Sequence, residues 1–255
     1  MQLDGKAAVI TGSSAGIGRA TAIALAEKGC SVLINYRQSR DDAEQAAHEA
    51  LSHGVRAVTF QADVADDSAC RAMMAAAVAA FGRLDILVNN AATTRFIAHG
   101  DLEGVAEQDW ERIIAVNLRG PFQCARAAQA PMLAAGGGVI INVASVAGIL
   151  GVGSSIPYAA SKAALINLTI TLAKALAPSI RVNAVAPGFV TGRWLELGLG
   201  AAYTSVKQQI ESRVPLHKVC EPHDVAAAIL SLITGSELIT GQTLVCDGGM
   251  TIAAS

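Results

Sequence analysis

The sequence is poor in aromatic and in charged residues. Only 4% of its 255 residues are aromatic and only 16% are charged, whereas 52% are hydrophobic. This composition excludes a disordered chain and indicates a compact fold with a large core and substantial buried subunit surface. The formal net charge is −2, and no run of like charges occurs. We therefore expect neither nucleic acid nor an anionic membrane as a partner.

Long hydrophobic runs are also missing. The most apolar stretches, AMMAAAVAAF and VIINVASVAGILGVG, are too short or too often interrupted to span a bilayer. The first residues enter an apolar, strand-like run, KAAVITG, with no basic segment and long apolar stretch before it. We therefore expect no signal peptide, no membrane partner and a cytoplasmic location.

Cysteine and histidine are few and dispersed along the chain. The five cysteines are odd in number and lie far apart in sequence, which is typical of reduced thiols rather than of a disulfide framework. Neither they nor the five histidines show the spacing of metal ligands, so no metal site is predicted. The cysteines are Cys30, Cys70, Cys124, Cys220 and Cys246.

What the chain does have is an alternation of short β-branched runs with longer Ala-rich segments of helical period. Strands that are apolar on both faces, separated by amphipathic helices, indicate a parallel sheet covered on both sides. We predict a single-domain α/β protein over residues 1–255, a doubly wound Rossmann fold with a seven-stranded parallel sheet. The predicted strands are 7–11, 31–36, 55–60, 85–90, 138–145, 180–187 and 242–249, and the predicted helices are 16–28, 40–53, 66–81, 107–134 and 157–177.

The turn after the first strand is rich in glycine. Gly12 suits a tight turn, and Gly16 and Gly18 allow close approach of the backbone to a ligand and of helix to strand. The free N–H groups at the helix start would then meet a pyrophosphate. A plain strand-to-helix turn could also use glycines, but a first βα turn of an alternating chain favours a nucleotide. Arg19 stands after the last glycine, without Gly-Lys-Ser/Thr, which disfavours NTPase chemistry.

A second motif, YAASK, places Tyr158 and Lys162 four residues apart, on one face of a predicted helix. Taken alone, the pair could be a packed tyrosine and a lysine at a helix edge. A phenol, with an ordinary pKa of about 10, is a suitable proton donor once that pKa is brought nearer to neutrality. A nearby ammonium would lower it, because the positive charge favours the phenolate.

The glycine spacing, TGxxxGIG, resembles that of the short-chain dehydrogenase/reductase family. Further stretches follow in that family's order over almost the whole chain, and their combination is far more specific than any one of them. They are DVAD at 63–66, NNAA at 89–92, VNLRG at 116–120, NVAS ending at Ser145, YAASK at 158–162 and APGFV at 186–190. Many members with this length and motif set are 3-oxoacyl-(acyl-carrier-protein) reductases.

The resemblance implies reversible hydride transfer between a nicotinamide ring and an alcohol or ketone. It makes Tyr158 the general acid/base, Lys162 the cation beside it and a ligand of the nicotinamide ribose, and Ser145 the holder of the substrate oxygen. Asn117 would hold a water in a proton path to Lys162. A dinucleotide-binding protein without turnover is the alternative, but such a protein would have lost the Tyr or the Lys, and neither is lost here.

The cofactor is predicted to be NADP(H), with NAD(H) possible. The acidic residue that usually ends the second strand of an NAD site is replaced by Tyr36, and Arg37 and Ser39 follow. Ala15 stands where the family often has a second basic marker, which leaves dual use open. The predicted cofactor contacts are Gly12, Ser13, Ser14, Gly16, Ile17, Gly18, Tyr36, Arg37, Ser39, Asp63, Val64, Asn89, Ala91, Tyr158, Lys162, Pro187, Gly188, Val190 and Thr191.

A substrate-binding insertion is predicted at about 191–218, the least regular part of the chain, after a strand end. With nearby apolar residues it would line a pocket of moderate size. A small or medium ketone, a β-keto ester or thioester, and a sugar-like polyol all remain open. The candidate pocket residues are Thr94, Phe96, Ile149, Leu150, Val152, Trp194, Leu195, Leu197, Leu199, Tyr203 and Val206.

The resemblance also implies an oligomer. Family members of this size are usually tetramers or dimers built on two long helices, here 107–134 and 157–177, and on the last strand. We therefore expect a homotetramer or a dimer that acts on a small-molecule carbonyl or alcohol. Two positions depart from the family pattern: Ala92 replaces a usual Gly, and Gly192 stands where a Thr is frequent, with Thr191 one residue earlier.

Overall fold

The computed structural model describes residues 1–253. Within this range seven strands form one sheet in the order β3-β2-β1-β4-β5-β6-β7, and all neighbours are parallel. The predicted fold class is confirmed. The strands are β1 (Ala7–Ile10), β2 (Ser31–Tyr36), β3 (Ala57–Gln61), β4 (Ile86–Asn89), β5 (Gly138–Val143), β6 (Ile180–Pro187) and β7 (Thr243–Cys246).

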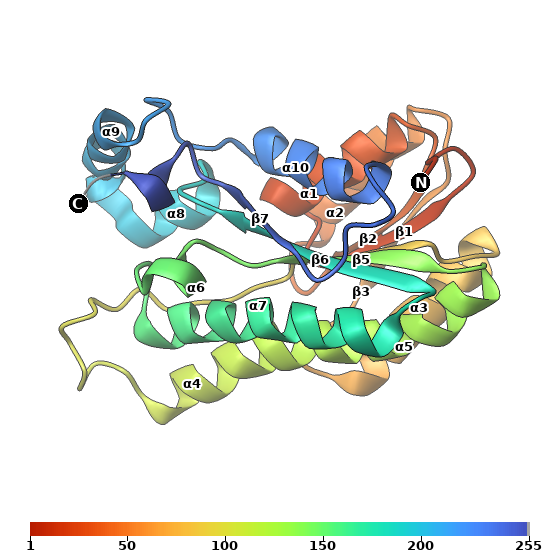
Figure 1. The fold of residues 1–255 in the computed structure, drawn as a ribbon, viewed down its shortest axis with the longest axis horizontal. Helices are drawn as coiled ribbons and strands as arrows, with labels where there is room; N and C mark the ends of the chain where they lie inside the picture. Colours follow the sequence, from red (N-terminus) through yellow and green to blue (C-terminus); the bar gives the residue numbers. More distant parts are fainter. Residues whose placement is uncertain (254–255) are drawn as a thin grey trace.

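Helices cover both faces of this sheet (Figure 1). One face carries α1 (Gly16–Ala26), α2 (Arg40–Leu51) and α10 (Pro222–Thr234). The other carries α3 (Asp67–Phe81), α5 (Gly120–Ala134) and α7 (Ile156–Leu176), with α4 (Glu107–Ile114) beside α7.

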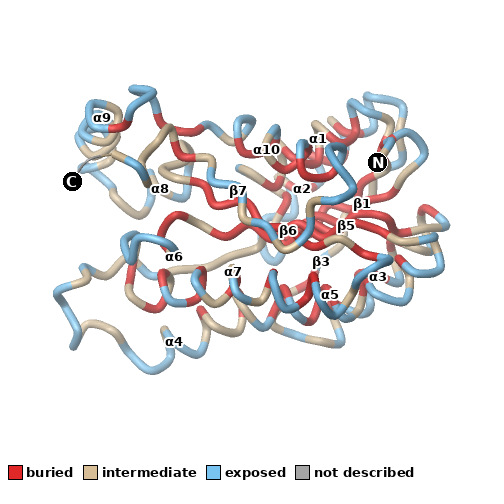
Figure 2. Tube along the Cα trace, viewed as in Figure 1, coloured by how far each residue is buried: buried red, intermediate tan, exposed pale blue. Residues whose placement is uncertain are grey.

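The core consists of two apolar layers, one on each face of the central strands. Side chains alternate along each strand, so Ile10 packs into the layer with Leu25 of α1, while Val9 packs into the layer with Met73 of α3. All four of these residues are fully buried. Figure 2 shows the central sheet and the inward helix faces as the buried part of the molecule. Burial on both faces explains why these strands have continuous rather than alternating hydrophobic runs.

The predicted long helix 107–134 is interrupted. Between α4 and α5, residues Ala115–Arg119 form one turn of π-helix, η1. Such turns occur mostly as single insertions in α-helices and often at functional sites. The turn contains Asn117, whose side chain is buried.

The segment 191–218 is also more regular than its sequence suggested. It folds into α8 (Arg193–Leu199), the 3₁₀ turn η2 (Gly200–Ala202) and α9 (Tyr203–Arg213), which lie beyond the ends of β6 and β7 (Figure 1). The sequence analysis also did not assign α10, the short α6 (Ala147–Leu150) or the 3₁₀ turn η3 (Met250–Ile252).

The strand ends determine where a ligand can bind. The carboxyl ends of parallel strands share one edge of the sheet, and open α/β sheets bind ligands there. At this edge β1 leads into the glycine turn, β5 into Ser145 and β6 into Gly188. Among residues 1–253, none of the helices combines the length and the hydropathy that a bilayer span requires.

Candidate active site

The glycine turn, residues 11–18, is held by two asparagines that the sequence analysis missed. The N–H of Gly12 donates to Oδ1 of Asn35 at 3.0 Å, and Asn90 donates from Nδ2 to the carbonyls of Thr11 and Gly12, both at 2.9 Å. The hydroxyl of Ser13 accepts the N–H of Asn35 at 3.0 Å. Hydrogen bonds within the protein therefore fix the shape of the turn.

The shape of this turn fits a dinucleotide. A Cβ on Gly18 would lie 2.5 Å from Nδ2 of Asn90, and one on Gly12 would lie 2.9 Å from Cα of Ala91. Gly16 has φ of +56°, and its Cβ position meets open space within the described residues. Among residues 1–253, no side chain caps the first turn of α1, so its N–H groups are free for a pyrophosphate.

Ser13, a predicted cofactor contact, lies inside the protein. Its hydroxyl donates to the carbonyl of Ile10 at 2.7 Å, and its own N–H donates to the carbonyl of Asn35 at 2.9 Å. Ser13 is fully buried and its donors are used inside the protein. It therefore supports the turn, while the neighbouring Ser14 and Ile17 are half-buried at its surface.

The end of β2 forms a rim with a cationic edge. The Tyr36 side chain is 8% exposed and packs into the core with α2, whereas Arg37 and Ser39 are exposed. The guanidinium of Arg37 lies 3.8 Å from Oδ2 of Asp63. No carboxylate occupies the Tyr36 position, which leaves the rim open to an anionic group.

Asp63 is bound mainly by Arg112, whose guanidinium donates to Oδ2 at 2.8 Å. Burial raises the pKa of Asp63, but hydrogen bonds from the N–H of Ala65 and from Arg112 outweigh it, and the net shift is downward. The carboxylate thus stays charged and holds Arg112 and, more loosely, Arg37 at the rim.

Two other predicted cofactor residues face the interior. Asn89 donates from Nδ2 to Oδ1 of Asn142 at 2.9 Å and to the carbonyl of Pro121 at 3.3 Å, so its side chain lies between β4, β5 and α5. The carbonyl of Val64 accepts from Gln123 at 2.8 Å. Strand alternation sends Asn89 inward, and it is the following Asn90 that reaches the glycine turn.

Ser145, Tyr158 and Lys162 converge at the end of β5. The side chains of Ser145 and Tyr158 line the same cavity, where the Ser145 hydroxyl opposes the rise in the pKa of the phenol. Nζ of Lys162 lies 5.7 Å from the centre of the Tyr158 ring and donates to the carbonyl of Val143 at 2.7 Å. The predicted triad of side chains is thus assembled around one point.

The pKa values differ from the prediction. Burial raises the pKa of Tyr158 to about 12, and the hydrogen bond to Ser145 opposes that rise. Burial also lowers the pKa of Lys162 to about 8. The predicted lowering of the Tyr158 pKa by Lys162 is therefore not found, because the ammonium is directed to Val143 and burial dominates both groups.

Asn117 anchors the loop after β4. Its Oδ1 accepts the N–H of Thr93 at 2.8 Å, and its Nδ2 donates to the carbonyl of Thr93 and to the Ser161 hydroxyl, both at 3.0 Å. Ser161 donates in turn to the carbonyl of Tyr158 at 2.7 Å. Asn117 thus ties the π-helical turn to the loop and to α7, while the water-holding role stays a prediction.

A cavity of about 540 Å³ opens beside Ser145 and Tyr158. Apart from these hydroxyls its wall is largely apolar. Six of the predicted pocket residues line it: Phe96, Val152, Trp194, Leu195, Leu199 and Val206. Other lining residues were not predicted, among them Ala98, Phe189, Gly198, Ile210 and Met250.

The other predicted pocket residues lie outside it. Oγ1 of Thr94 lies 2.7 Å from Oγ of Ser154, a hydrogen bond that holds the loop. Ile149 and Leu150 project outward from the short α6 and are 48% and 41% exposed, and Leu197 of α8 is 84% exposed. Tyr203 packs behind the wall, with its ring 5.8 Å from that of Phe189.

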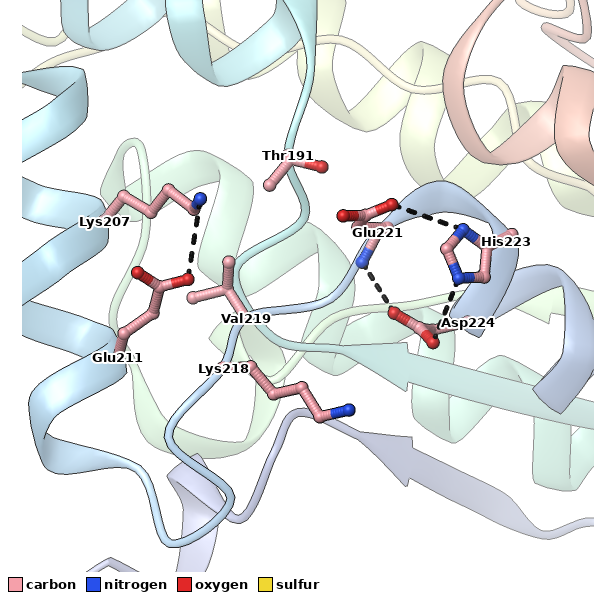
Figure 3. Close-up of a pocket in the computed structure, with 8 residues that line it drawn as sticks. All are labelled: Thr191, Lys207, Glu211, Lys218, Val219, Glu221, His223 and Asp224. Carbon is pink, nitrogen blue, oxygen red and sulfur yellow. Dashed lines mark hydrogen bonds and ion pairs between the residues drawn. The ribbon is translucent and has the colours of Figure 1, made fainter.

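The chain after β6 links this cavity to a second one. Gly188 donates to the carbonyl of Cys246 at 2.9 Å, and Thr191 donates to the carbonyl of Cys220 at the same distance. Val190 forms a β-bridge with Cys220. The Thr191 side chain lines a smaller cavity of about 180 Å³ among charged residues of α9 and α10, shown in Figure 3. The side chain of Thr191 therefore belongs to the smaller cavity.

One long-range ion pair was not predicted. Arg193, the first residue of α8, donates to Oδ2 of Asp42 in α2 at 2.7 Å. The pair connects the segment around the cavity with the helix that begins at the cationic rim, although the two residues are 151 positions apart.

The sheet order, the preformed glycine turn and the hydroxyl pair at the same edge define a dinucleotide-binding protein of the doubly wound class. Comparisons extend this conclusion. A family model described as "Enoyl-(Acyl carrier protein) reductase" matches residues 12–251. The 3-oxoacyl-(acyl-carrier-protein) reductase FabG of Staphylococcus aureus strain N315 is 40% identical over 247 residues, which are 96% of this chain and 98% of that protein.

Solved structures give the same result. A Burkholderia xenovorans protein described as a short-chain dehydrogenase/reductase is 36% identical, with a TM-score of 0.90 over 97% of this chain and 98% of that one. An NAD+-bound xylitol dehydrogenase is 30% identical, with a TM-score of 0.89 over 98% of this chain and all of that one. The chain belongs to the short-chain dehydrogenase/reductase family and is an NAD(P)-dependent oxidoreductase that acts on CH–OH groups.

Proposed function

We propose that this enzyme reduces the keto group of an apolar ketone or β-keto ester or thioester to a secondary alcohol, reversibly, with NADP(H). One observation carries the proposal: Ser145 and Tyr158 lie together in the wall of a largely apolar cavity, in which Ser154 supplies the other side-chain hydroxyl. Two converging donors suit a single oxygen atom on which negative charge develops.

The side chains divide the work of the reaction. The Ser145 hydroxyl holds the substrate oxygen and stabilises its developing charge. A bound nicotinamide dinucleotide supplies the hydride. Tyr158 then gives its phenolic proton to the oxygen. Its raised pKa keeps the phenol protonated at neutral pH, which suits the direction of ketone reduction.

Lys162 and Asn117 keep these hydroxyls in place. Lys162 donates to the carbonyl of Val143, the last residue of β5, and so fixes its own position beneath the tyrosine ring. Asn117 acts through Ser161 on the backbone of α7 at Tyr158. We propose that a cofactor ribose meets Lys162, as the resemblance implies for the family.

The preference for NADP(H) rests on the rim after β2. Tyr36 presents no carboxylate, and the exposed Arg37 and Ser39 offer a guanidinium and a hydroxyl to a 2′-phosphate. Arg37→Ala should raise the KM for NADPH about tenfold, the factor that a lost charge-assisted hydrogen bond of about 1.4 kcal/mol would cause, and leave that for NADH unchanged. Arg40→Ala is the matched control, since Arg40 is paired with Glu44. Equal effects on both cofactors would contradict the preference.

The substrate class follows from the cavity wall. Trp194, Leu195, Leu199 and Val206 favour an alkyl or acyl arm over a polyol. The Staphylococcus relative is named for a 3-oxoacyl substrate on a carrier protein, which supports a β-keto thioester. An NAD-dependent polyol dehydrogenase is the second candidate, which the likeness to the xylitol enzyme supports.

A ketone and enone panel tests the proposal. β-Keto esters, β-keto thioesters, 2-enoyl thioesters and polyols are assayed by absorbance at 340 nm with each cofactor. Ketones should react with NADPH, and Tyr158→Phe should lower kcat by about 10²–10⁴-fold. Tyr203→Phe is the matched control, because that ring lies behind the pocket wall. Reduction of the enoyl compounds alone, or full activity of Tyr158→Phe, would overturn the proposal.

We also propose that the chain is one domain with the substrate segment, residues 191–218, inserted after β6, and that it assembles as a homotetramer or dimer. The exposed Phe122 and Leu133 of α5, Ile170 of α7 and Leu244 of β7 support an apolar contact at those elements. Light scattering of the protein as it elutes from a size-exclusion column measures its mass in solution. The mass of a monomer would contradict the proposed assembly.

A further inference from the structure

Four of the five cysteines, although distant in sequence, lie in two pairs. Cys70 of α3 and Cys124 of α5 are fully buried, with their Sγ atoms 3.5 Å apart. Cys220 and Cys246 form the second pair, behind the Gly188–Thr191 chain. The Cys220 thiol donates to the carbonyl of Cys246 at 3.1 Å, which places its sulfur beside that residue.

The two pairs differ in their access to solvent. Cys246, the last residue of β7, is half-buried, whereas Cys70 and Cys124 have no exposed surface. Sγ of Cys246 lies 3.9 Å from the carbonyl of Asp224, and Asp224 lines the polar cavity of Figure 3. A small hydrophilic oxidant can therefore come close to Cys246 but not to the other pair.

The pair also has the asymmetry of an attacking and a resolving thiol. The hydrogen bond from Cys220 lowers the pKa of Cys246 to about 7, although burial opposes this. The same bond and burial raise the pKa of Cys220. Thiolate, the reactive form, therefore accumulates on the less buried residue of the pair.

We propose that Cys246 and Cys220 form an oxidisable dithiol site that a hydroperoxide converts to a disulfide. The Cys246 thiolate attacks one peroxide oxygen, the O–O bond breaks, and hydroxide leaves with a sulfenic acid on Cys246. The Cys220 sulfur attacks that sulfur, the S–O bond breaks, and the thiol proton leaves with the hydroxyl as water. Two electrons pass from the sulfurs to the peroxide.

The disulfide would act on the substrate pocket. Cys220 donates its N–H to the carbonyl of Phe189 and accepts the N–H of Thr191, both at 2.9 Å. Phe189 lines the pocket. A disulfide brings the sulfurs to about 2.05 Å, closer than any hydrogen bond, and so draws Cys220 and the pocket wall toward β7. A displacement of 1 Å near a reaction centre can cost about 10²-fold, and we expect about a tenfold fall in kcat/KM.

Hydrogen peroxide and mass spectrometry test the site directly. The reduced full-length protein is treated with peroxide, its remaining thiols are alkylated, and its mass and peptides are measured. We expect the loss of two hydrogen atoms, mapped to a Cys220–Cys246 peptide, and reversal by dithiothreitol. Cys246→Ser should abolish this product and Cys70→Ala should keep it. No disulfide, or one between Cys70 and Cys124, would overturn the proposal.

The coupling to the pocket needs a readout that does not depend on the proposed function. In a Trp110→Phe background, Trp194 of the pocket wall is the remaining tryptophan. Oxidation should shift its fluorescence, lower kcat/KM for an active ketone about tenfold, and do neither in Cys246→Ser. A mapped disulfide that leaves the Trp194 emission unchanged would overturn the coupling. A mapped disulfide in a protein that reduces no ketone would overturn only the proposed function.

Discussion

The glycine turn and the substrate segment both follow a strand of the same sheet, yet different contacts hold them. The turn is fixed by the buried side chains of Ser13 and Asn35 and by Asn90. By contrast, α8 and α9, both inside the described residues 1–253, contain no buried residue. The glycine turn is therefore held rigidly by buried hydrogen bonds, whereas the substrate segment can change shape at little cost in stability.

The largest expected effect comes from Gly18→Ala in the glycine turn. The added Cβ would lie 2.5 Å from Nδ2 of Asn90 and 2.6 Å from the carbonyl oxygen of Gly12, where neither group can move without losing its bond. We expect a loss of about 3 kcal/mol in the free energy of unfolding and weaker cofactor binding. Urea denaturation and cofactor titration measure both. A variant as stable as the wild type would show that the turn is not rigid.

The next effect concerns Lys162 and pH. Its pKa is about 8 in the folded protein against an ordinary 10.5, so the unfolded chain binds more protons between these values. Lys162 should therefore contribute a rise of about 2 kcal/mol to the free energy of unfolding from pH 8 to pH 10, at about 1.4 kcal/mol per unit. The raised pKa values of the buried Cys30, Cys124 and Cys220 thiols act in the opposite sense within this range, and that of Tyr158 does so above pH 10.

The measurement is urea denaturation at several pH values, with Lys162→Met beside the wild type. The difference in the free energy of unfolding between the wild type and Lys162→Met should grow by about 2 kcal/mol over this range. Lys174→Met, at an exposed position of α7, should keep the pH dependence of the wild type. A rise that persists in Lys162→Met would assign it to another group.

A smaller effect is expected from Gly198→Ala, the counterpart of Gly18→Ala in the substrate segment. Its Cβ would meet the ring of Phe96, the end of a side chain that can rotate away. We expect a stability change below about 1 kcal/mol, because the strain can be relieved. The KM for a bulky ketone should rise about tenfold, because one added methyl group narrows the pocket and a change of that size alters binding by about this factor. A loss of stability as large as that of Gly18→Ala would remove the contrast between the two regions.

The smallest effect belongs to the ion pair between the two regions. Arg193→Ala removes the contact with Asp42, and an exposed pair contributes at most about 1 kcal/mol. We expect unchanged stability and a rise of about threefold in the KM for both cofactors. A threefold change in affinity corresponds to less free energy than an exposed ion pair can contribute. Asp42→Asn should reproduce it, and 0.5 M salt should weaken the wild type to the same level. A change in kcat alone would contradict a positioning role.

The sequence predicted the sheet well because parallel strands that are buried on both faces are continuous hydrophobic runs in the sequence. It also predicted that Ser145 and Tyr158 lie at one site, because both belong to motifs that follow in the order of the family that the chain resembles. The partners of the glycine turn could not be predicted, because Asn35 and Asn90 act from 23 and 78 positions away. The sequence contains no feature that distinguishes these two asparagines from the others in the chain.

Side-chain direction was the main source of error. Ile149 and Leu150 are apolar and close in sequence to Ser145, but one short helix turns them outward. Lys162 stands one turn from Tyr158 as expected, yet its Nζ is directed to Val143. Hydrophobicity and spacing do not determine such directions; the backbone path around each residue does.

The β-bridge between Val190 and Cys220 gives the substrate segment a closed base. The N–H of Thr191 and the N–H of Cys220 both donate across it at 2.9 Å. The chain between these residues is a loop whose ends already meet, and doubling the length of such a loop costs only about 0.6 kcal/mol. The segment can therefore be replaced as a unit: a segment grafted from another enzyme would leave the sheet and the glycine turn intact and would test whether residues 191–218 select the substrate.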